Sequence, residues 1–218
     1  MRRAAAAIAV IAWAVFAATA AVRILAGDGA RIGREMLRAA PAASTGLPES
    51  EYDGAGKMIA GYLTGERETF QYEYTSREGT VIRCFGEREQ QHMADVRGLI
   101  RTDETVMWVS LSAAAALAAA GRSIRGMRIG ILAAAAATAG TAIWAAVNFD
   151  GFFITFHRIA FRNDLWLLDP RTEMLIRLMP TAFFTRMAGT AGILATGIFI
   201  LPIAAIEAAD AKRRRGKA

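Results

Sequence analysis

The chain alternates between long apolar stretches and two polar segments. Four stretches approach or reach the length of about 20 apolar residues that an α-helix needs to cross a bilayer. They are 4–25, 105–121, 129–147 and 183–206. The second is the shortest and consists mostly of alanine, so we expect its insertion to depend on packing against its neighbours. The pattern predicts an α-helical membrane protein with four transmembrane helices.

The composition agrees with this class, because 54% of the residues are apolar, which is high for a soluble domain. The first stretch is longer than the apolar core of a cleaved signal peptide, so we expect a signal anchor that stays in place. In the fourth stretch, close approach of helix backbones is predicted at Gly189, Gly192 and Gly197. The single cysteine, Cys84, excludes an intrachain disulfide.

Basic residues predict the orientation of the spans, because short cytoplasmic loops are enriched in Lys and Arg. Clusters precede the first span, separate the second from the third and follow the fourth: Arg2, Arg3, Arg122, Arg125, Arg128, Lys212, Arg213, Arg214, Arg215 and Lys217. With four spans, all three clusters fall on one side, which places both termini in the cytoplasm. The net charge of +6 is then a topology signal and an attraction to anionic headgroups, rather than a nucleic-acid surface.

This orientation divides the chain into membrane-spanning and outer parts. The expected order is transmembrane helix 1 (1–25), an extracytoplasmic segment (26–104), transmembrane helices 2 and 3 with a short cytoplasmic turn (105–147), an extracytoplasmic interfacial segment (148–182), transmembrane helix 4 (183–206) and a basic cytoplasmic tail (207–218). Both outer segments are rich in polar and aromatic residues, so we look for chemistry there.

The first outer segment has the pattern of a small α+β region. We expect a helix at 48–63, a β-hairpin at 68–85 and a second helix at 87–101 that leads into the second span. In the second hairpin strand, Val81 and Phe85 could share one face by alternation. This adds a helix, a hairpin and a helix to the membrane-spanning fold.

The chain has two histidines, His92 and His157, and the predicted topology places both outside the cytoplasm. Imidazole titrates near neutrality, so it is the natural proton carrier at a site with few polar groups. Glu89 and Asp95 each lie three residues from His92, so both carboxylates can reach the ring and favour its protonated form. The alternative is an exposed, charged helix face that includes a histidine by chance.

The second outer segment predicts an amphipathic helix at 152–161 that lies at the bilayer surface. Phe153 and Phe156 flank His157 on this helix, so the imidazole would sit near the boundary between acyl chains and headgroups. Trp166 is the kind of residue that anchors a segment at this interface.

Turn and capping residues follow in the same segment. Asn163 marks a turn after the interfacial helix. Asp169 before Pro170 looks like an N-cap with proline at the first helical position, opening a short helix that ends before Pro180. Capping does not exclude a further supporting role for Asp169.

Several kinds of chemistry do not fit these residues. The sequence has no HxxxH or HExxH, and the two histidines with Asp95 or Asp169 could only just supply the three ligands of a catalytic zinc. It also has no GxSxG nucleophile motif, and Cys84 in a predicted strand is better explained by packing. General acid–base catalysis remains, with the nucleophile provided by the substrate. We therefore expect no metal and no cofactor.

Three stretches together resemble the lipoprotein intramolecular transacylase (Lit) family of bacterial membrane proteins: EREQQHMADVRGLI at 87–100, FHRIAFRNDLWLLDP at 156–170 and LIRLMPTAFF at 175–184. The resemblance extends from the first span through the fourth. It implies an enzyme that acts on diacylglyceryl lipoproteins in the outer leaflet of the cytoplasmic membrane. Such an enzyme moves the sn-2 acyl chain of the glyceryl group onto the α-amino group of the same N-terminal cysteine, giving the lyso-form lipoprotein.

Carried over by these motifs, His92 and His157 are the expected catalytic pair. The expected supporting residues are Arg88, Glu89, Asp95, Asn163 and Asp169. The residues expected to face substrate and lipid are Phe153, Phe156 and Trp166.

We expect His157 to be the general base, because aromatic surroundings disfavour its cation. His92 would be a charged donor to the oxyanion or to the leaving glyceryl oxygen. The expected partners are lipoproteins and membrane lipids, and the expected protein is a monomer that binds no nucleic acid. Two alternatives stay open: a non-catalytic membrane scaffold or sensor, and an intermolecular lipid acyltransferase or hydrolase.

Overall fold

The computed structural model describes residues 1–120 and 123–215, with side chains at 1–119 and 123–201. Arg122 and Lys217, which belong to the predicted basic clusters, therefore lie outside the described residues.

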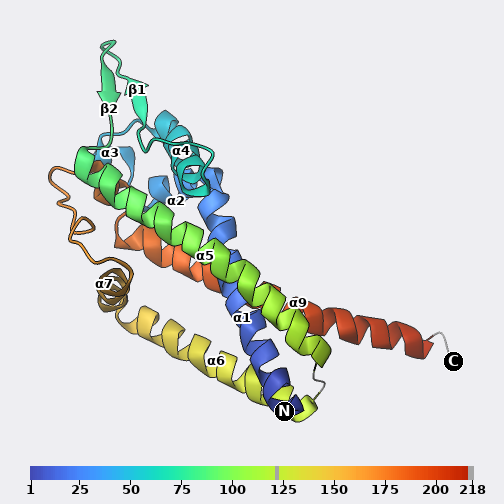
Figure 1. Ribbon diagram of the computed structural model, residues 1–218. Helices are drawn as coiled ribbons and strands as arrows, with labels where there is room; N and C mark the ends of the chain where they lie inside the picture. Colours follow the sequence, from blue (N-terminus) through green and yellow to red (C-terminus); the bar gives the residue numbers. More distant parts are fainter. Residues whose placement is uncertain (121–122, 216–218) are drawn as a thin grey trace. The chain divides into compact units, whose positions relative to one another are not determined.

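The described chain is mainly helical with one small hairpin (Figure 1). Its elements in order are α1 (Arg2–Gly27), α2 (Gly29–Ala39), α3 (Ala42–Thr45), the short 3₁₀ helix η1 (Glu49–Glu51), α4 (Tyr52–Thr64), β1 (Glu73–Thr75), β2 (Val81–Arg83), α5 (Glu87–Ala120), α6 (Ile124–Val147), α7 (Phe149–Ala160), α8 (Met174–Leu178) and α9 (Thr181–Arg215). The predicted order of helix, hairpin and helix in the first outer segment is confirmed.

Three helices in the described residues are long and apolar enough to cross a membrane: Arg2–Gly27, Ile124–Val147 and Thr181–Leu201. The predicted second span forms the C-terminal part of α5, which continues without a break from the outer helix at its start. This part is rich in alanine, which contributes little apolar surface per residue. The four-span count therefore stays a prediction, whereas three candidate spans are present.

The chain forms two compact units. One comprises 1–21, 106–135 and 190–218, and the other comprises 22–105 and 136–189. Both predicted outer segments lie wholly in the second unit, so this unit carries both histidines.

In the first unit, small residues let α1 and α6 approach closely. A Cβ added at Gly126 would come within 2.3 Å of a backbone oxygen of α1, and one at Gly130 within 2.7 Å. By contrast, an added Cβ would meet no atom within 4 Å at Gly189, Gly192 or Gly197 in the described structure. The prediction that these three glycines pack helices together is wrong, because glycines of α6 have this role instead.

The core of the second unit lies between α2, α4, α8 and the base of the hairpin. Its largest fully buried side chains are Tyr52, Met36, Leu47, Met58, Ile59 and Leu178. The helix predicted at 48–63 is present as η1 and α4, and Gly65 ends it in the left-handed conformation with φ 89°. Glycine adopts this conformation without the steric cost that a side chain brings.

The hairpin pairs Tyr74 with Ile82 across two antiparallel strands. These two residues face the same side, so their neighbours along the strands point the other way. Val81 is accordingly 61% exposed, whereas Phe85 is buried at 3%. The predicted shared face of Val81 and Phe85 is wrong, because the paired strand ends at Arg83 and the chain then turns into the core.

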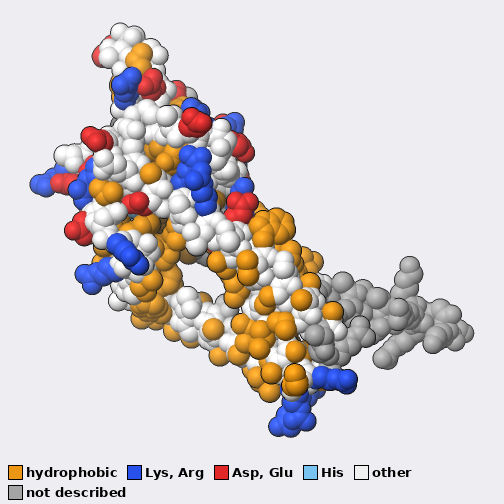
Figure 2. Space-filling model, viewed as in Figure 1, with side chains coloured by type: hydrophobic (Ala, Val, Ile, Leu, Met, Phe, Trp, Pro, Cys, Tyr) orange, Lys and Arg blue, Asp and Glu red, His pale blue; other side chains and the backbone are white. Residues whose placement is uncertain are grey.

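Polar and apolar side chains are distributed differently over the elements (Figure 2). Charged side chains gather over the hairpin and α4, whereas hydrophobic side chains cover much of α6. Ile129, Leu132 and Ile143 of α6 are among the exposed apolar residues. Such a surface on a helix that is long enough to span fits contact with lipid.

The contact between α2 and α4 generates the first prediction. A Cβ at Gly56 would meet both the backbone oxygen of Gly29 and the backbone nitrogen of Gly33 at 2.4 Å. Gly56→Ala should therefore force the helices apart and lower stability by about 1–3 kcal/mol, measured by thermal unfolding in detergent. The matched control is Gly98→Ala on α5, where an added Cβ meets nothing within 4 Å. This control should raise stability by up to about 1 kcal/mol through helix propensity, and equal effects of the two changes would contradict the packing argument.

Candidate functional site

The first turn of α5 is fixed by Glu89. One oxygen of this buried carboxylate accepts a hydrogen bond from the Gly86 N–H at 2.6 Å. The other oxygen accepts one from the Leu175 N–H at the start of α8, also at 2.6 Å. Both N–H groups belong to helix beginnings, which leave backbone donors without intrahelical partners. Glu89 therefore joins α5 to α8, and the expectation that it reaches the ring of His92 is wrong.

His157 lies in the last turn of α7, and its Nδ1 is 2.8 Å from the backbone oxygen of Phe153. A carbonyl oxygen can only accept, so Nδ1 carries the proton and donates it. In the neutral ring, Nε2 is then left with a lone pair that can accept a proton.

Aromatic rings surround His157. The ring centroids of Phe153, Trp166, Phe156 and Phe161 lie at 4.0, 5.1, 5.3 and 5.5 Å from that of His157. The side chain is only 7% exposed. Burial lowers the pKa of His157 from its usual 6.5, and the hydrogen bond to the Phe153 carbonyl opposes this in part. The ring is therefore neutral at neutral pH.

His92 faces His157 from α5, with ring centroids 6.2 Å apart. Its other aromatic neighbour is Phe161, whose ring lies edge-on at 5.3 Å. Nδ1 of His92 is buried and has no hydrogen-bond partner among the described residues. The two histidines are expected from the sequence to act as a pair, and in the structure their rings are neighbours.

Burial is also the main cause that lowers the pKa of His92, to about 4. His157 and Arg88 lower it further, whereas Asp95 opposes the shift. The expectation of a charged His92 is wrong, because burial and a second imidazole outweigh the nearby carboxylate. A pair this close takes up a second proton only against the repulsion of the first.

Two side chains of α5 hold the segment that follows α7. Asp95 accepts a hydrogen bond from the Asn163 side-chain amide at 2.8 Å. Arg88 donates to the backbone oxygens of Asp164 and, at 3.3 Å, Leu167. The expected supporting residues Arg88, Asp95 and Asn163 thus position this segment beside the histidines, and Asp95 makes its bond to Asn163 rather than to His92.

The predicted cap at Asp169 is wrong in detail. Its carboxylate accepts from the Arg171 backbone N–H at 2.9 Å and forms an ion pair with that side chain at 2.6 Å. The helix itself begins later, at Met174 with Glu173 as N-cap, and ends before Pro180 as predicted. In the described structure, no hydrogen bond or ion pair joins Asp169 to either histidine.

Phe161 is a site residue that the sequence reasoning missed. It is buried and contacts the rings of both histidines. Its place at the end of the helix predicted at 152–161, four residues after His157, was a usable signal, although in the structure Phe161 is the extended C-cap of α7.

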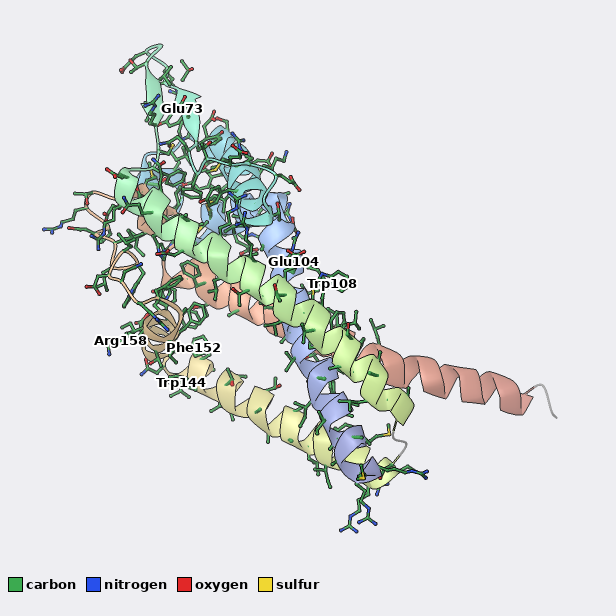
Figure 3. The ribbon with its side chains drawn as sticks, in the orientation of Figure 1. Glu73, Glu104, Trp108, Trp144, Phe152 and Arg158 are labelled. Atoms are coloured by element: carbon green, nitrogen blue, oxygen red, sulfur yellow. The ribbon has the colours of Figure 1, made fainter. Side chains whose placement is uncertain are left out.

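The opposite side of α7 is apolar and exposed. Phe156, Ile154 and Ile159 are exposed, and Trp144 of α6 contacts Phe152 of α7 edge-on at 5.3 Å (Figure 3). Such a surface beside the buried His157 fits the predicted interfacial helix. Phe153 and Trp166, also expected to face lipid, are half-buried against the imidazole.

In the described residues, no group of three or more His, Cys, Asp or Glu side chains is placed to hold a metal ion. The arrangement offers instead two neutral imidazoles, one of them with a fixed tautomer, inside an aromatic shell. Such a site can accept a proton at one ring and donate a hydrogen bond from the other.

Comparison with known proteins adds the family. The family model for the lipoprotein intramolecular transacylase Lit matches residues 7–184. A solved structure of membrane-integral Lit from Bacillus cereus is similar, with a TM-score of 0.75, 19% identity and coverage of 99% of this chain and 98% of that chain. Two variants of the same protein, with one histidine replaced by arginine or alanine, give TM-scores of 0.65 and 0.66, identities of 21% and 20%, and coverage of 98% of this chain and 93% and 94% of theirs. No curated protein matches the chain.

The lowered pKa values generate the second prediction. Because the chain has two histidines, histidine-selective ¹⁵N labelling and NMR in detergent should resolve both. Each ring should stay neutral as the pH falls through 6.5, with His92 titrating near pH 4. In denatured protein both should titrate near 6.5, so stability should fall as the pH drops below that value. A folded-state pKa at or above 6.5 for His92 would contradict its burial.

Proposed function

The chain belongs to the lipoprotein intramolecular transacylase (Lit) family, a family of enzymes of the transferase kind, and we propose that it catalyses acyl transfer within diacylglyceryl lipoproteins. The sn-2 acyl chain moves to the α-amino group of the same N-terminal cysteine, and the product is the lyso-form lipoprotein. The observation that carries this proposal is the buried pair of neutral imidazoles, His92 and His157, with ring centroids 6.2 Å apart.

The reaction requires proton movement at two places. The α-ammonium loses one proton and becomes a nucleophilic amine, which attacks the ester carbonyl and forms a C–N bond. The tetrahedral intermediate then breaks its C–O bond to the glyceryl group. The glyceryl oxygen takes a proton as it leaves, and the nitrogen loses its second proton to become an amide. One proton is released overall, so the site must accept and return protons at close range.

His157 is the proposed general base. Its Nδ1–H is held by the Phe153 carbonyl, which leaves Nε2 as the proton acceptor. The lowered pKa keeps Nε2 free of a proton at neutral pH. A neutral base in an aromatic site can accept the proton of an ammonium group that enters in its charged form.

His92 is the proposed hydrogen-bond donor to the developing oxyanion and the leaving oxygen. In its neutral form it donates from one ring nitrogen, and its buried Nδ1 makes no bond to the described residues. A donor held ready in a water-poor site stabilises negative charge more effectively than the same donor in water. When His157 takes a proton, the charge on that ring further disfavours a second cation at His92.

Several features support a lipid substrate that reaches the site from the bilayer. Each buried CH₂ group of an acyl chain is worth about 0.8 kcal/mol, so such a substrate stays in the membrane. The exposed apolar side chains of α7, including Phe156 and Ile159, lie on the same helix as His157. We propose a multi-pass protein of the bacterial cytoplasmic membrane, acting as a monomer, with the site on the extracytoplasmic side.

The third prediction tests the base. His157→Gln keeps hydrogen bonding but cannot accept the ammonium proton, so transacylation should fall by about 10²–10⁴. The matched control is Arg158→Gln, one residue along α7 with an exposed side chain (Figure 3), which should keep wild-type activity. Mass spectrometry of lipoprotein N-termini, from cells with and without each variant, gives the readout.

Three outcomes of this measurement separate the alternatives. Full activity of His157→Gln would overturn the base assignment. Absence of any acyl change with the wild-type protein would favour a scaffold or sensor. An acyl chain transferred to a different molecule or to water would favour an intermolecular acyltransferase or hydrolase.

The fourth prediction separates positioning residues from a surface ion pair. Asn163→Ala removes the bond to Asp95 and should lower kcat by about tenfold, because misplaced catalytic groups lose rate steeply. Asp169→Asn should change kcat by less than about threefold, because in the described structure the Asp169 carboxylate bonds only to exposed Arg171 and asparagine makes similar turn bonds. Both rates are measured on a purified lipopeptide, with thermal unfolding as the control for folding. An equal decrease of kcat in both variants would show that Asp169 also positions the catalytic residues.

A further inference from the structure

A polar hollow beside the hairpin is not used by the chemistry above. It has a volume of about 390 Å³ and is lined by Arg67, Thr69, Gln71, Tyr72 and Glu73. Four of these five residues are every second residue of a segment that bends at Glu66 and Glu68 and becomes a strand at Glu73. The segment runs from α4 to β1, where Glu73 is labelled in Figure 3.

The Gln71 side chain stabilises the hollow by bonding to the backbone of Phe85, as a paired strand would do. The Gln71 amide donates to the Phe85 backbone oxygen at 2.8 Å, and its oxygen accepts from the Phe85 N–H at 3.1 Å. Gln71 thereby ties this segment to the chain that enters α5. The sheet of the described residues has two strands, so the edge of β1 away from β2 is unpaired.

One wall of the hollow is also fixed. The Tyr72 hydroxyl donates to Glu51 at 2.7 Å, and burial with the nearby Glu51 carboxylate raises the pKa of Tyr72. The ring lies against Gly54, where an added Cβ would come within 2.3 Å of the hydroxyl oxygen. The hollow is therefore preformed.

The lining fits a polypeptide better than an acyl chain. It contains amide, hydroxyl and both signs of charge, and Arg67 is exposed and makes no ion pair with the described residues. Extended peptides bind beside free strand edges through main-chain hydrogen bonds, with alternate side chains in pockets. From Thr69 to Glu73 an extended chain would cover about 13 Å, which accommodates about four residues of a bound peptide.

A short connection links the hollow to the helix that carries His92. Gln71 is bonded to Phe85, and α5 begins at Glu87. His92 follows five residues later, a rise of about 7.5 Å. This rise along α5 equals the length of two or three extended residues, because each covers about 3.3 Å.

We infer that the hollow binds, in extended form, the polypeptide of the lipoprotein directly after its lipidated cysteine. This rests on the proposed function, because it requires that the cysteine reacts at the histidine pair. The hollow would then recognise the protein part of the substrate by its main chain, with Arg67 placed for carbonyl or carboxylate oxygens. Such recognition lowers KM and leaves the chemical step unchanged.

The experiment compares two synthetic lipopeptides with the same diacylglyceryl cysteine, one with about two residues after it and one with about ten. With the full-length protein in detergent micelles, the long peptide should have a KM about tenfold lower and the same kcat. In Thr69→Trp, which fills the hollow, this gain should disappear while the short peptide keeps its wild-type KM and kcat. The control is Glu68→Trp, an exposed neighbour that does not line the hollow, which should keep the gain.

The outcomes separate this inference from the proposed function. If the wild-type protein converts the short and long peptides with the same KM, or if Thr69→Trp keeps the full gain, the hollow does not bind the substrate chain. If the wild-type protein converts neither peptide, the proposed transacylation itself fails. If both tryptophan variants lose the lower KM of the long peptide equally, the proposed binding site is also overturned, because the effect would then not depend on filling the hollow.

Discussion

The carboxylate of Glu89 is the contact on which the site depends. It is buried between two helix beginnings and accepts a backbone hydrogen bond from each, at Gly86 and Leu175. A hydrogen bond to a charged group typically contributes about 1.5–3 kcal/mol to stability. Through Glu89 the start of α5 and the start of α8 form one rigid corner, and the segment between α7 and α8 is then fastened to α5 by Arg88 and Asp95. The two imidazoles meet because these elements meet.

The closeness of the rings limits the charge that the site can hold. Burial makes each imidazolium costly, and a second one at a centroid separation of 6.2 Å adds repulsion. Both rings are therefore neutral in the resting protein, and the pair can accept one additional proton at a time. A substrate that brings its own proton on an ammonium group matches this condition, because the amine can form only when a neutral base is at hand. The aromatic shell around His157 thus favours the protonation state that the proposed base requires.

Sequence reasoning succeeded where local patterns decide and failed where partners compete. The helix at 48–63 and the hairpin followed from apolar spacing and turn residues, and both formed. The spacing of residues on a helix shows which side chains can reach His92. It does not show which other hydrogen-bond donors compete with His92 for the carboxylates of Glu89 and Asp95. Glu89 instead accepts hydrogen bonds from the backbone N–H groups at the beginnings of two helices, which have no intrahelical partner. The prediction that Val81 and Phe85 share one face was wrong for a related reason. The paired strand ends where the chain turns into the core, and the spacing of residues does not show where that happens.

The polar hairpin and the apolar surface of α7 belong to the same compact unit. A lipoprotein is an amphiphile whose acyl chains prefer lipid and whose polypeptide prefers water, so its ester and its amine meet only at the boundary between the two. A site there has to be dry enough to keep imidazole neutral and open enough to admit both ends of the substrate. Because nucleophile and ester belong to one molecule, holding them in contact can supply an effective molarity of about 10⁵ M or more. The proposed mechanism then needs no covalent intermediate, with one neutral imidazole as the proposed proton acceptor and the other as the proposed hydrogen-bond donor.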